Sequence, residues 1–166
     1  VEPEGLLSIS PAGRATPLRD GTATLTASKD GAQATATIIV KGAAANRSLH
    51  FTNDVVPVMT KYGCNGGGCH GKSEGQNGFK LSLLGFEPGE DYEHLVHESR
   101  GRRLFPAAPE SSLLLLKGTG EMPHGGGDRM ERGSPDYQML VRWMEQGMPK
   151  GDPAAPVPVR LAIFPQ

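Results

Sequence analysis

The hydrophobic and polar positions of this chain follow two different periods. Residues 21–28 and 34–40 are Thr-rich runs of period two that flank an Asp-Gly pair at 30–31. Such alternation around an Asp-Gly turn predicts a β-hairpin. Residues 157–164, which follow a Pro-rich stretch, alternate in the same way and predict a further strand. We therefore expect β-structure at both ends of the chain.

The middle of the chain, residues 51–151, has helical spacing interrupted by long Gly-rich segments. The spacing predicts a first helix capped by Asn53 or Asp54, a second helix over 90–99 and a short one over 109–116.

The last helix has the clearest signals. Ser134 is a good N-cap, Pro135 suits the first helical position, and Gly147 marks the end. Its apolar face should cover part of a core and consists of Met139, Leu140, Trp143 and Met144.

Composition adds three constraints to this picture. The 166 residues include 23 Gly and 14 Pro, so much of the chain should be turn and loop, and aromatic residues make up only 5%. A bound cofactor would supply the missing apolar mass. The formal net charge of −1 argues against a nucleic-acid-binding protein. No apolar run approaches the ~20 residues that a membrane-spanning helix needs, so we expect no membrane span.

The first residues resemble neither a translation start nor an export signal. The chain begins at Val1 rather than Met, and the opening residues have neither a basic nor an apolar segment. We expect a piece excised from a longer protein.

The two cysteines lie in the segment Cys64-Asn65-Gly66-Gly67-Gly68-Cys69-His70. A disulfide would close a short loop of little stabilising value and would leave His70 unexplained. A redox dithiol usually has two intervening residues at a helix N-terminus. Zinc needs four ligands, and no second pair of cysteines completes a tetrahedron.

The pattern is closest to the Cys-x-x-Cys-His signature of covalently bound c-type haem. In that signature two thiols bond to the porphyrin edge, and the following histidine is held under the iron. The spacer here has four residues instead of two. We expect its glycines to reach positive φ and to loop outward without displacing either sulfur. Haem is thus the favoured interpretation, with a disulfide or a metal ion as alternatives.

A haem iron held by His70 needs a second axial ligand. The segment 121–127 contains both Met122 and His124 on one Gly-rich loop before the last helix. We expect His94 and His97 to face solvent on their helix and His50 to be a linker residue. Arg102 and Arg103 are candidates for contacts with haem propionates, since Arg binds carboxylates in a planar bidentate manner. Trp143 is expected to be a core residue.

Four motifs together resemble the planctomycete-type cytochrome c domain. They are Phe51-x-Asn53-Asp54-Val55, Gly63 to Lys72 around the cysteines, Gly78 to Phe86, and Pro123-His124-Gly125-Gly126-Gly127. The resemblance covers residues 51–151. It implies a mainly α, class I-like cytochrome c domain with Gly-rich loops, carried in exported proteins that also contain bacterial Ig-like domains of group 2.

The same resemblance bears on the domain plan and on the iron ligands. It implies the closing strands of an Ig-like domain over 1–42, the cytochrome domain over 51–151, and a linker with the first strand of another Ig-like domain over 152–166. Because the Pro-His-Gly element recurs in the family, it ranks His124 ahead of Met122 as the distal ligand.

These observations predict electron transfer by one covalently bound haem c. The haem would be attached through Cys64 and Cys69 in the periplasm or cell envelope, with a redox protein or a neighbouring domain as partner. No catalytic dyad or triad is evident, so we do not expect an enzyme. The alternatives are a haem-based gas sensor and a haem-free, disulfide-closed adhesion module associated with Ig-like domains.

Overall fold

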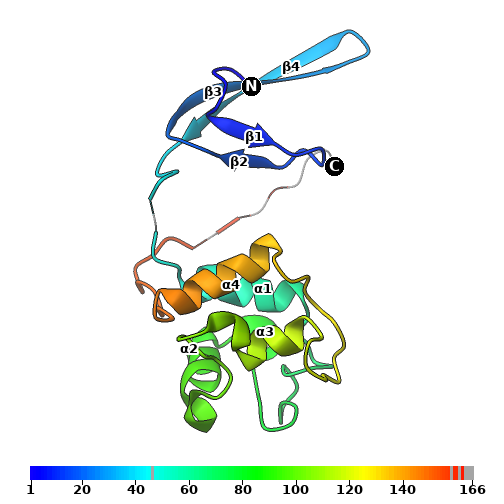
Figure 1. Ribbon diagram of the computed structural model, residues 1–166, viewed down its shortest axis with the longest axis vertical. Coiled ribbons are helices and arrows are strands. Elements are labelled where there is room, and N and C mark those ends of the chain that lie inside the picture. Colours follow the sequence, from blue (N-terminus) through cyan, green and yellow to red (C-terminus); the bar gives the residue numbers. More distant parts are fainter. Residues whose placement is uncertain (46, 158, 161, 163–166) are drawn as a thin grey trace. The chain divides into compact units, whose positions relative to one another are not determined.

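The computed structural model describes residues 1–45, 47–157, 159, 160 and 162. The chain divides into two compact units, Val1–Arg47 and Ser48–Gln166 (Figure 1). Each unit has its own cluster of buried hydrophobic residues. The division falls between 42 and 51, in the stretch that the sequence leaves between its β region and its helical region.

The first unit consists of two β-hairpins. Strands β3 (Gly21–Lys29) and β4 (Ala32–Val40) pair antiparallel, with Gly21 opposite Val40 and Lys29 opposite Ala32. Asp30 and Gly31 form the two-residue turn with φ of 49° and 81°, as a type I′ hairpin requires. The predicted hairpin is therefore confirmed.

A second, shorter hairpin was not predicted. Strands β1 (Leu7–Ile9) and β2 (Ala15–Pro17) pair antiparallel and are only three residues long, too short to show an alternating pattern. The core of this unit is small and consists of Leu6, Leu7, Ala23 and Val40. The identification of this unit with part of an Ig-like domain stays a prediction.

The second unit begins with a π-helical turn, Phe51–Val55, that continues into α1 (Val56–Lys61). The predicted N-caps Asn53 and Asp54 are wrong, because both lie inside this turn. The residue at the N-cap position is His50, whose Nδ1 accepts a hydrogen bond from the Asn53 amide at 3.4 Å.

The helix predicted over 90–99 is broken into three pieces of different pitch. They are α2 (Pro88–Tyr92), a π-helical turn (Glu93–His97) and a 3₁₀ turn (Glu98–Gly101). Ser99 and Arg100 have φ of 55° and 62°, in the left-handed region, so the helix cannot continue through them.

The remaining short helices separate the Gly-rich segments. A 3₁₀ turn spans Leu83–Gly85, another spans Pro109–Ser111, and α3 spans Leu113–Gly118. The last two replace the single short helix predicted over 109–116.

Helix α4 (Pro135–Glu145) confirms the prediction for the last helix. Its N-cap Ser134 accepts a hydrogen bond from the Tyr137 amide at 3.3 Å. The helix is joined to α1 by Asp136, which accepts from the Lys61 ammonium at 2.5 Å and from the Tyr62 hydroxyl at 2.9 Å.

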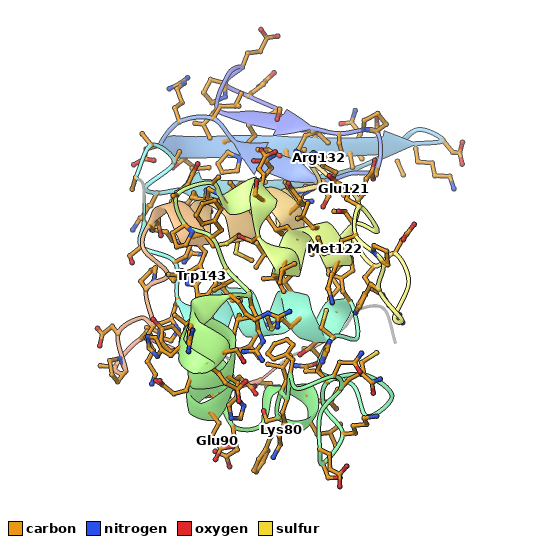
Figure 2. All side chains as sticks on the ribbon, turned by 60° about the horizontal axis from the view of Figure 1, so that its bottom comes forward. Lys80, Glu90, Glu121, Met122, Arg132 and Trp143 are labelled. Carbon is orange, nitrogen blue, oxygen red and sulfur yellow. The ribbon has the colours of Figure 1, made fainter. Side chains whose placement is uncertain are left out.

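An aromatic cluster lies at the centre of the second unit. Trp143 is completely buried, as expected (Figure 2), and its ring lies 5.7 Å from that of Phe51. Phe51 in turn contacts Tyr92 edge to face at 5.2 Å. The indole N–H of Trp143 donates to the Pro149 carbonyl at 3.0 Å. The last helix, the first helix and α2 thus share one core.

The expected mainly α, class I-like cytochrome c fold is wrong for this chain. Helices account for 30% of the described residues and strands for 17%, and α4 has only 11 residues. The glycines explain the short helices, because residues such as Gly63, Gly101 and Gly147 have positive φ and lie at the ends of helical segments. The second unit is a set of short helices around a loop-built site.

The C-terminal segment leaves one prediction open. Of the strand predicted over 157–164, residues 158, 161, 163 and 164 lie outside the described residues, and the others are in no strand. No helix within the described residues has the length and apolar character needed to cross a membrane, in agreement with the sequence.

Candidate functional site

The first cysteine is positioned by the end of α1. Gly63 has φ of 71°, its amide donates to the Thr60 carbonyl at 3.0 Å, and the Cys64 amide donates to the Met59 carbonyl at 2.8 Å. This pair of hydrogen bonds is a Schellman motif, in which a left-handed glycine closes the helix. Cys64 is therefore fixed to the last turn of α1.

The histidine of the motif is brought back to the first cysteine. The His70 amide donates to the Cys64 carbonyl at 3.0 Å, and the Cys69 amide donates to the Gly66 carbonyl at 2.9 Å. The four-residue spacer thus forms a closed loop between Cys64 and His70.

The spacer glycines do not have the conformation that the sequence suggested. Gly66, Gly67 and Gly68 all have negative φ, so the loop closes without left-handed residues. The glycine that the fold requires is Gly71, where a Cβ atom would lie 1.9 Å from the Asn65 carbonyl oxygen. The outward loop depends on this close approach of two backbone segments.

Both cysteines are half-buried free thiols that line one cavity. Burial raises the pKa of the Cys64 thiol, the neighbouring Cys69 adds to the rise, and the charge of Arg129 opposes it. The environment of Cys64 therefore favours the protonated thiol.

His70 lies at the same cavity with one ring nitrogen occupied. Its Nδ1 is 3.0 Å from the Phe79 carbonyl oxygen, and the Phe79 ring lies 4.6 Å away. A carbonyl can only accept, so Nδ1 carries the proton and Nε2 keeps its lone pair. Burial lowers the pKa of His70, and the charges of His124, Arg103 and Lys117 act in the same direction.

His124 lines the same cavity and makes a similar hydrogen bond. Its Nδ1 lies 3.3 Å from the Gly127 carbonyl oxygen, within the tight turn of the 124–127 segment. The centres of the His70 and His124 rings are 6.2 Å apart, and the ring planes are inclined by only 6°. The two imidazoles thus form a parallel pair, and a main-chain oxygen lies within hydrogen-bond distance of each Nδ1.

This separation fits a metal ion between the two rings. A metal–imidazole bond is about 2.0 Å long, and the ring centre lies about 1.1 Å behind the bonding nitrogen, so two imidazoles on either side of one metal ion would have ring centres about 6.2 Å apart. Hydrogen bonds from the other ring nitrogen to carbonyls are typical of metal-bound histidines. However, no group of three or more His, Cys, Asp or Glu residues suited to a metal ion is found within the described residues. The pair suits a metal whose other ligands come from elsewhere, as in a porphyrin.

The cavity between these groups has a volume of about 440 Å³, within the ~300–1,000 Å³ that is usual for ligand pockets. Much of its wall is apolar, and among the described residues that line it there is no Asp or Glu. The apolar lining includes Met59, Phe79, Leu81, Leu95, Leu113 and Leu114.

Positive side chains border the cavity. Arg102 and Arg129 are exposed, Lys117 is partly exposed, and all three contribute to the lining. An amphipathic ligand with an apolar body and carboxylate groups suits this combination of apolar wall and basic rim.

Arg103 has a different environment from its neighbour Arg102. Its guanidinium is buried and donates to the carbonyls of His94 at 2.6 Å and Gly78 at 2.7 Å, besides pairing with Glu98 at 2.8 Å. Its donors are thus largely used to join the 93–101 helical segment to the loop at 78. Of the two arginines proposed for propionates, only Arg102 has a free, exposed guanidinium within the described structure.

Several other candidates can now be placed. Met122 lies on the loop between α3 and α4 (Figure 2) and is not among the described residues that line the cavity. His97 is exposed and pairs with Glu93 as expected. The expectation for His94 is wrong, because it is half-buried and its Nδ1 is enclosed.

The expectation for His50 as a linker residue is also wrong. Besides capping the first helical turn, its Nε2 lies 2.9 Å from the Asp152 carbonyl oxygen, and its ring leaves no room for a Cβ at Gly151. His50 joins the two ends of the second unit.

Two features of the site were missed by sequence reasoning. Lys117 lies in an apolar helix at the cavity rim, and the Phe79 carbonyl orients His70. Main-chain atoms leave no signal in a sequence, whereas a single Lys in the run Leu113 to Gly118 was a detectable exception.

Comparison of this chain with protein-family models, with curated proteins and with solved structures finds no significant match.

Proposed function

We propose that residues 51–151 bind one haem c and transfer electrons. The observation that carries this proposal is the pair of parallel imidazoles, with ring centres 6.2 Å apart, each with Nδ1 held by a carbonyl and with no hydrogen bond to Nε2 from the described residues. A porphyrin supplies four of the six iron ligands, so two histidines from the protein complete the set. His70 is the proximal ligand and His124, rather than Met122, the distal one.

The cysteines support covalent attachment of the haem. Cys64 and Cys69 line the same cavity as the two histidines, and Cys69 directly precedes His70 as in the haem c signature. A disulfide alone leaves the histidine pair unexplained, and a bare metal ion lacks a third protein ligand within the described residues. The resemblance to the planctomycete-type cytochrome c domain belongs to the same proposal, without the class I-like fold.

The basic rim supports the orientation of the haem. Its two propionates need positive partners or water, and Arg102, Lys117 and Arg129 border the cavity without any carboxylate competing among the described lining residues. Arg103 supports the site indirectly, because it holds the loop that precedes Phe79.

Electron transfer follows from the saturated coordination. Bound haem supplies an iron that changes between the ferrous and ferric states. With protein ligands on both sides, small molecules have no open position, and little has to move when the charge changes. The partner is a redox protein or a neighbouring domain of a longer, exported chain, since haem c is attached outside the cytoplasm.

Expression together with a haem c maturation system tests the proposal. The intact mass should show one haem added to the chain, and the Cys64→Ser, Cys69→Ser double variant should show none. A mass that corresponds to the protein alone with a Cys64–Cys69 disulfide would support the adhesion module instead. Rapid and stoichiometric binding of carbon monoxide by the reduced protein would support the gas sensor.

A further inference from the structure

His124 lies at the tip of a loop that is closed at its base. The loop connects α3 to α4, and the amides of Arg129 and Met130 both donate to the Gly118 carbonyl, at 2.8 and 2.9 Å. Within the described residues, the only hydrogen-bond partner of the His124 side chain is the Gly127 carbonyl, in the loop itself. The position of His124 over the cavity therefore depends on how the base of the loop is held.

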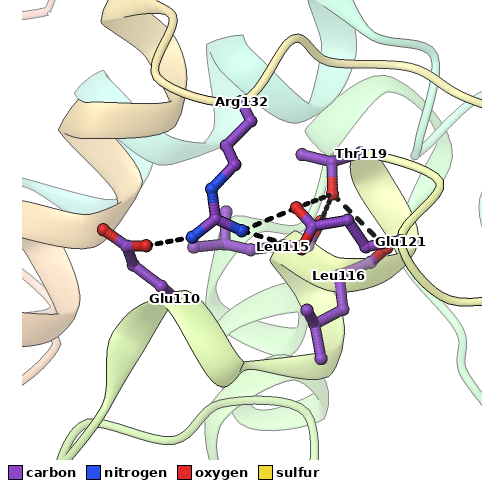
Figure 3. Close-up of polar contacts among 6 residues, drawn as sticks. All are labelled: Glu110, Leu115, Leu116, Thr119, Glu121 and Arg132. Carbon is purple, nitrogen blue, oxygen red and sulfur yellow. Dashed lines mark hydrogen bonds and ion pairs between the residues drawn. The ribbon is translucent and has the colours of Figure 1, made fainter.

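An ion-pair network crosses this base (Figure 3). Both carboxylate oxygens of Glu121 accept from Nη1 of Arg132 at 2.7 Å, and Nη2 of Arg132 pairs with Glu110. The Thr119 hydroxyl also donates to Glu121 at 3.0 Å. Arg132 thus joins the start of the loop, the end of the loop and the 3₁₀ turn Pro109–Ser111.

We propose that Arg132 is a positioning residue that keeps the His124 loop closed over the cavity by joining Glu121 to Glu110. This proposal rests on the proposed function, because it concerns the distal ligand of the haem. Arg132 does not line the cavity, so it acts only through the loop.

The charges of the network explain why Arg132 alone has a large effect on loop closure. Two carboxylates lie on one guanidinium, and without it Glu110 and Glu121 would face each other as like charges. The main-chain hydrogen bonds to Gly118 would remain, so the loop should persist but open more often. The side chains of Arg132, Glu110 and Glu121 are 50%, 51% and 39% exposed, so salt should weaken the network.

The rate of carbon monoxide binding to the reduced haem protein measures this opening, because His124 must leave the iron first. Individual exposed ion pairs contribute modestly, but Arg132→Met removes two and leaves a repulsion, so we expect the rate to rise about three- to tenfold. Arg132→Lys keeps the charge without the planar fork and should give an intermediate rate. Arg142 is an exposed arginine on α4 that makes no ion pair within the described structure, so Arg142→Met is the matched control and should not change the rate.

A further variant separates repulsion from a general loss of packing. The triple variant Arg132→Met, Glu110→Gln, Glu121→Gln lacks the facing charges, and its rate should return toward that of the wild type. An Arg132→Met protein with a normal His124-ligated spectrum and an unchanged rate overturns the proposal. If Arg132→Met does not fold, the wild type decides: its rate should rise with salt, and a salt-independent rate overturns the proposal.

Failure of the proposed function would look different. If the chain takes up no haem, or if His124→Ala leaves the low-spin spectrum intact, His124 is no ligand and the proposed function is wrong. If His124→Ala removes the low-spin spectrum but Arg132→Met binds carbon monoxide at the wild-type rate, only the proposed role of Arg132 is wrong.

Discussion

Both imidazoles at the site take their orientation from a main-chain carbonyl. Phe79 supplies the oxygen for His70, and Gly127 supplies it for His124. No side-chain substitution removes these acceptors. The orientation of both imidazoles is therefore determined by the course of two loops, and changes that reshape these loops should affect the proposed iron site before they affect the core.

Substitution of His124 tests the distal ligand directly. His124→Ala should convert six-coordinate low-spin iron to a high-spin form, because it removes one of two axial nitrogens. His124→Met should restore low spin and raise the midpoint potential, since a thioether favours ferrous iron. Absorption spectroscopy and redox titration measure both effects. Met122→Leu is the control, and a loss of low spin in that variant would transfer the ligand role to Met122.

The thiol of Cys64 should titrate above its ordinary range before haem is attached. Its burial raises the pKa, so folding favours the protonated thiol. The associated stabilisation is present below the ordinary pKa and is lost as the pH rises through the raised value. The pH dependence of iodoacetamide labelling in Cys69→Ser should therefore shift to lower pH when the chain is unfolded in urea.

Two arginine variants refine this prediction. Arg129 opposes the rise in the pKa of Cys64, so Arg129→Gln should move the labelling midpoint to still higher pH. Arg102→Gln is the matched control, because Arg102 borders the cavity without a resolved effect on Cys64. Equal shifts of the labelling midpoint in both variants would show that the pKa of Cys64 depends on the total charge at the cavity rim and not on Arg129 in particular.

The residues that carry the thiol and imidazole groups of the site were predictable from the sequence. The residues that orient these groups were not. Cys64, Cys69, His70 and His124 were identified as candidates, and the structure places all four at one cavity. The distinction between Arg102 and Arg103 depends on which guanidinium is buried, and adjacent residues of one type carry no such information in a sequence.

At the scale of elements, the loop between the cysteines offers a matched pair of glycines. A Cβ at Gly71 would lie 1.9 Å from the Asn65 carbonyl oxygen, whereas a Cβ at Gly68 has nothing within 4 Å. Neither glycine has positive φ. Gly71→Ala should lower the free energy of unfolding by about 1–3 kcal/mol, and Gly68→Ala should leave it unchanged or raise it by up to about 1 kcal/mol.

Urea denaturation of both variants, followed by fluorescence of Trp143, measures the difference. Similar losses of stability in the two variants would contradict the close approach at Gly71. Haem uptake should follow the same order, because the Asn65 segment connects the two cysteines.

Elements whose ends are marked by typical capping or turn residues were predicted correctly. Helix α4 has its N-cap serine and its proline in place, and the hairpin of β3 and β4 has its Asp-Gly turn. The helix predicted over 90–99 ends early, because Glu98 is extended and Ser99 and Arg100 adopt positive φ, which their residue types do not indicate. The first helix starts earlier than predicted. Its start was missed because its N-cap residue is a histidine, which is uncommon at that position.

For the whole molecule, the two units differ in the size of their cores. The core cluster of the second unit lies entirely between Leu49 and Met148, whereas that of the first unit comprises four buried residues. A chain that starts at Ser48 should keep its helical circular dichroism, its melting temperature and its haem. The isolated 1–47 fragment should be marginally stable, because two hairpins bury little apolar surface.

Circular dichroism and thermal unfolding of the two fragments check this expectation. A Ser48 fragment that loses helical signal would show that the first unit is part of the cofactor-binding fold. Trypsin should cut the intact protein first at Lys41 or Arg47, which are exposed and lie at the division between the units.

The hydrogen bond from the His70 amide to the Cys64 carbonyl also bears on the unusual spacing of the motif. It sets the histidine relative to the first cysteine and leaves the residues between them as a side loop. Because Cys69 directly precedes His70, its Cα stays about 3.8 Å from that of the histidine, and insertions or deletions among residues 65–68 should leave both cysteines and the histidine in place. In the proposed haem complex, the length of the spacer could then vary without changing the two attachment points, and chains with shortened spacers should still take up haem at the same two cysteines.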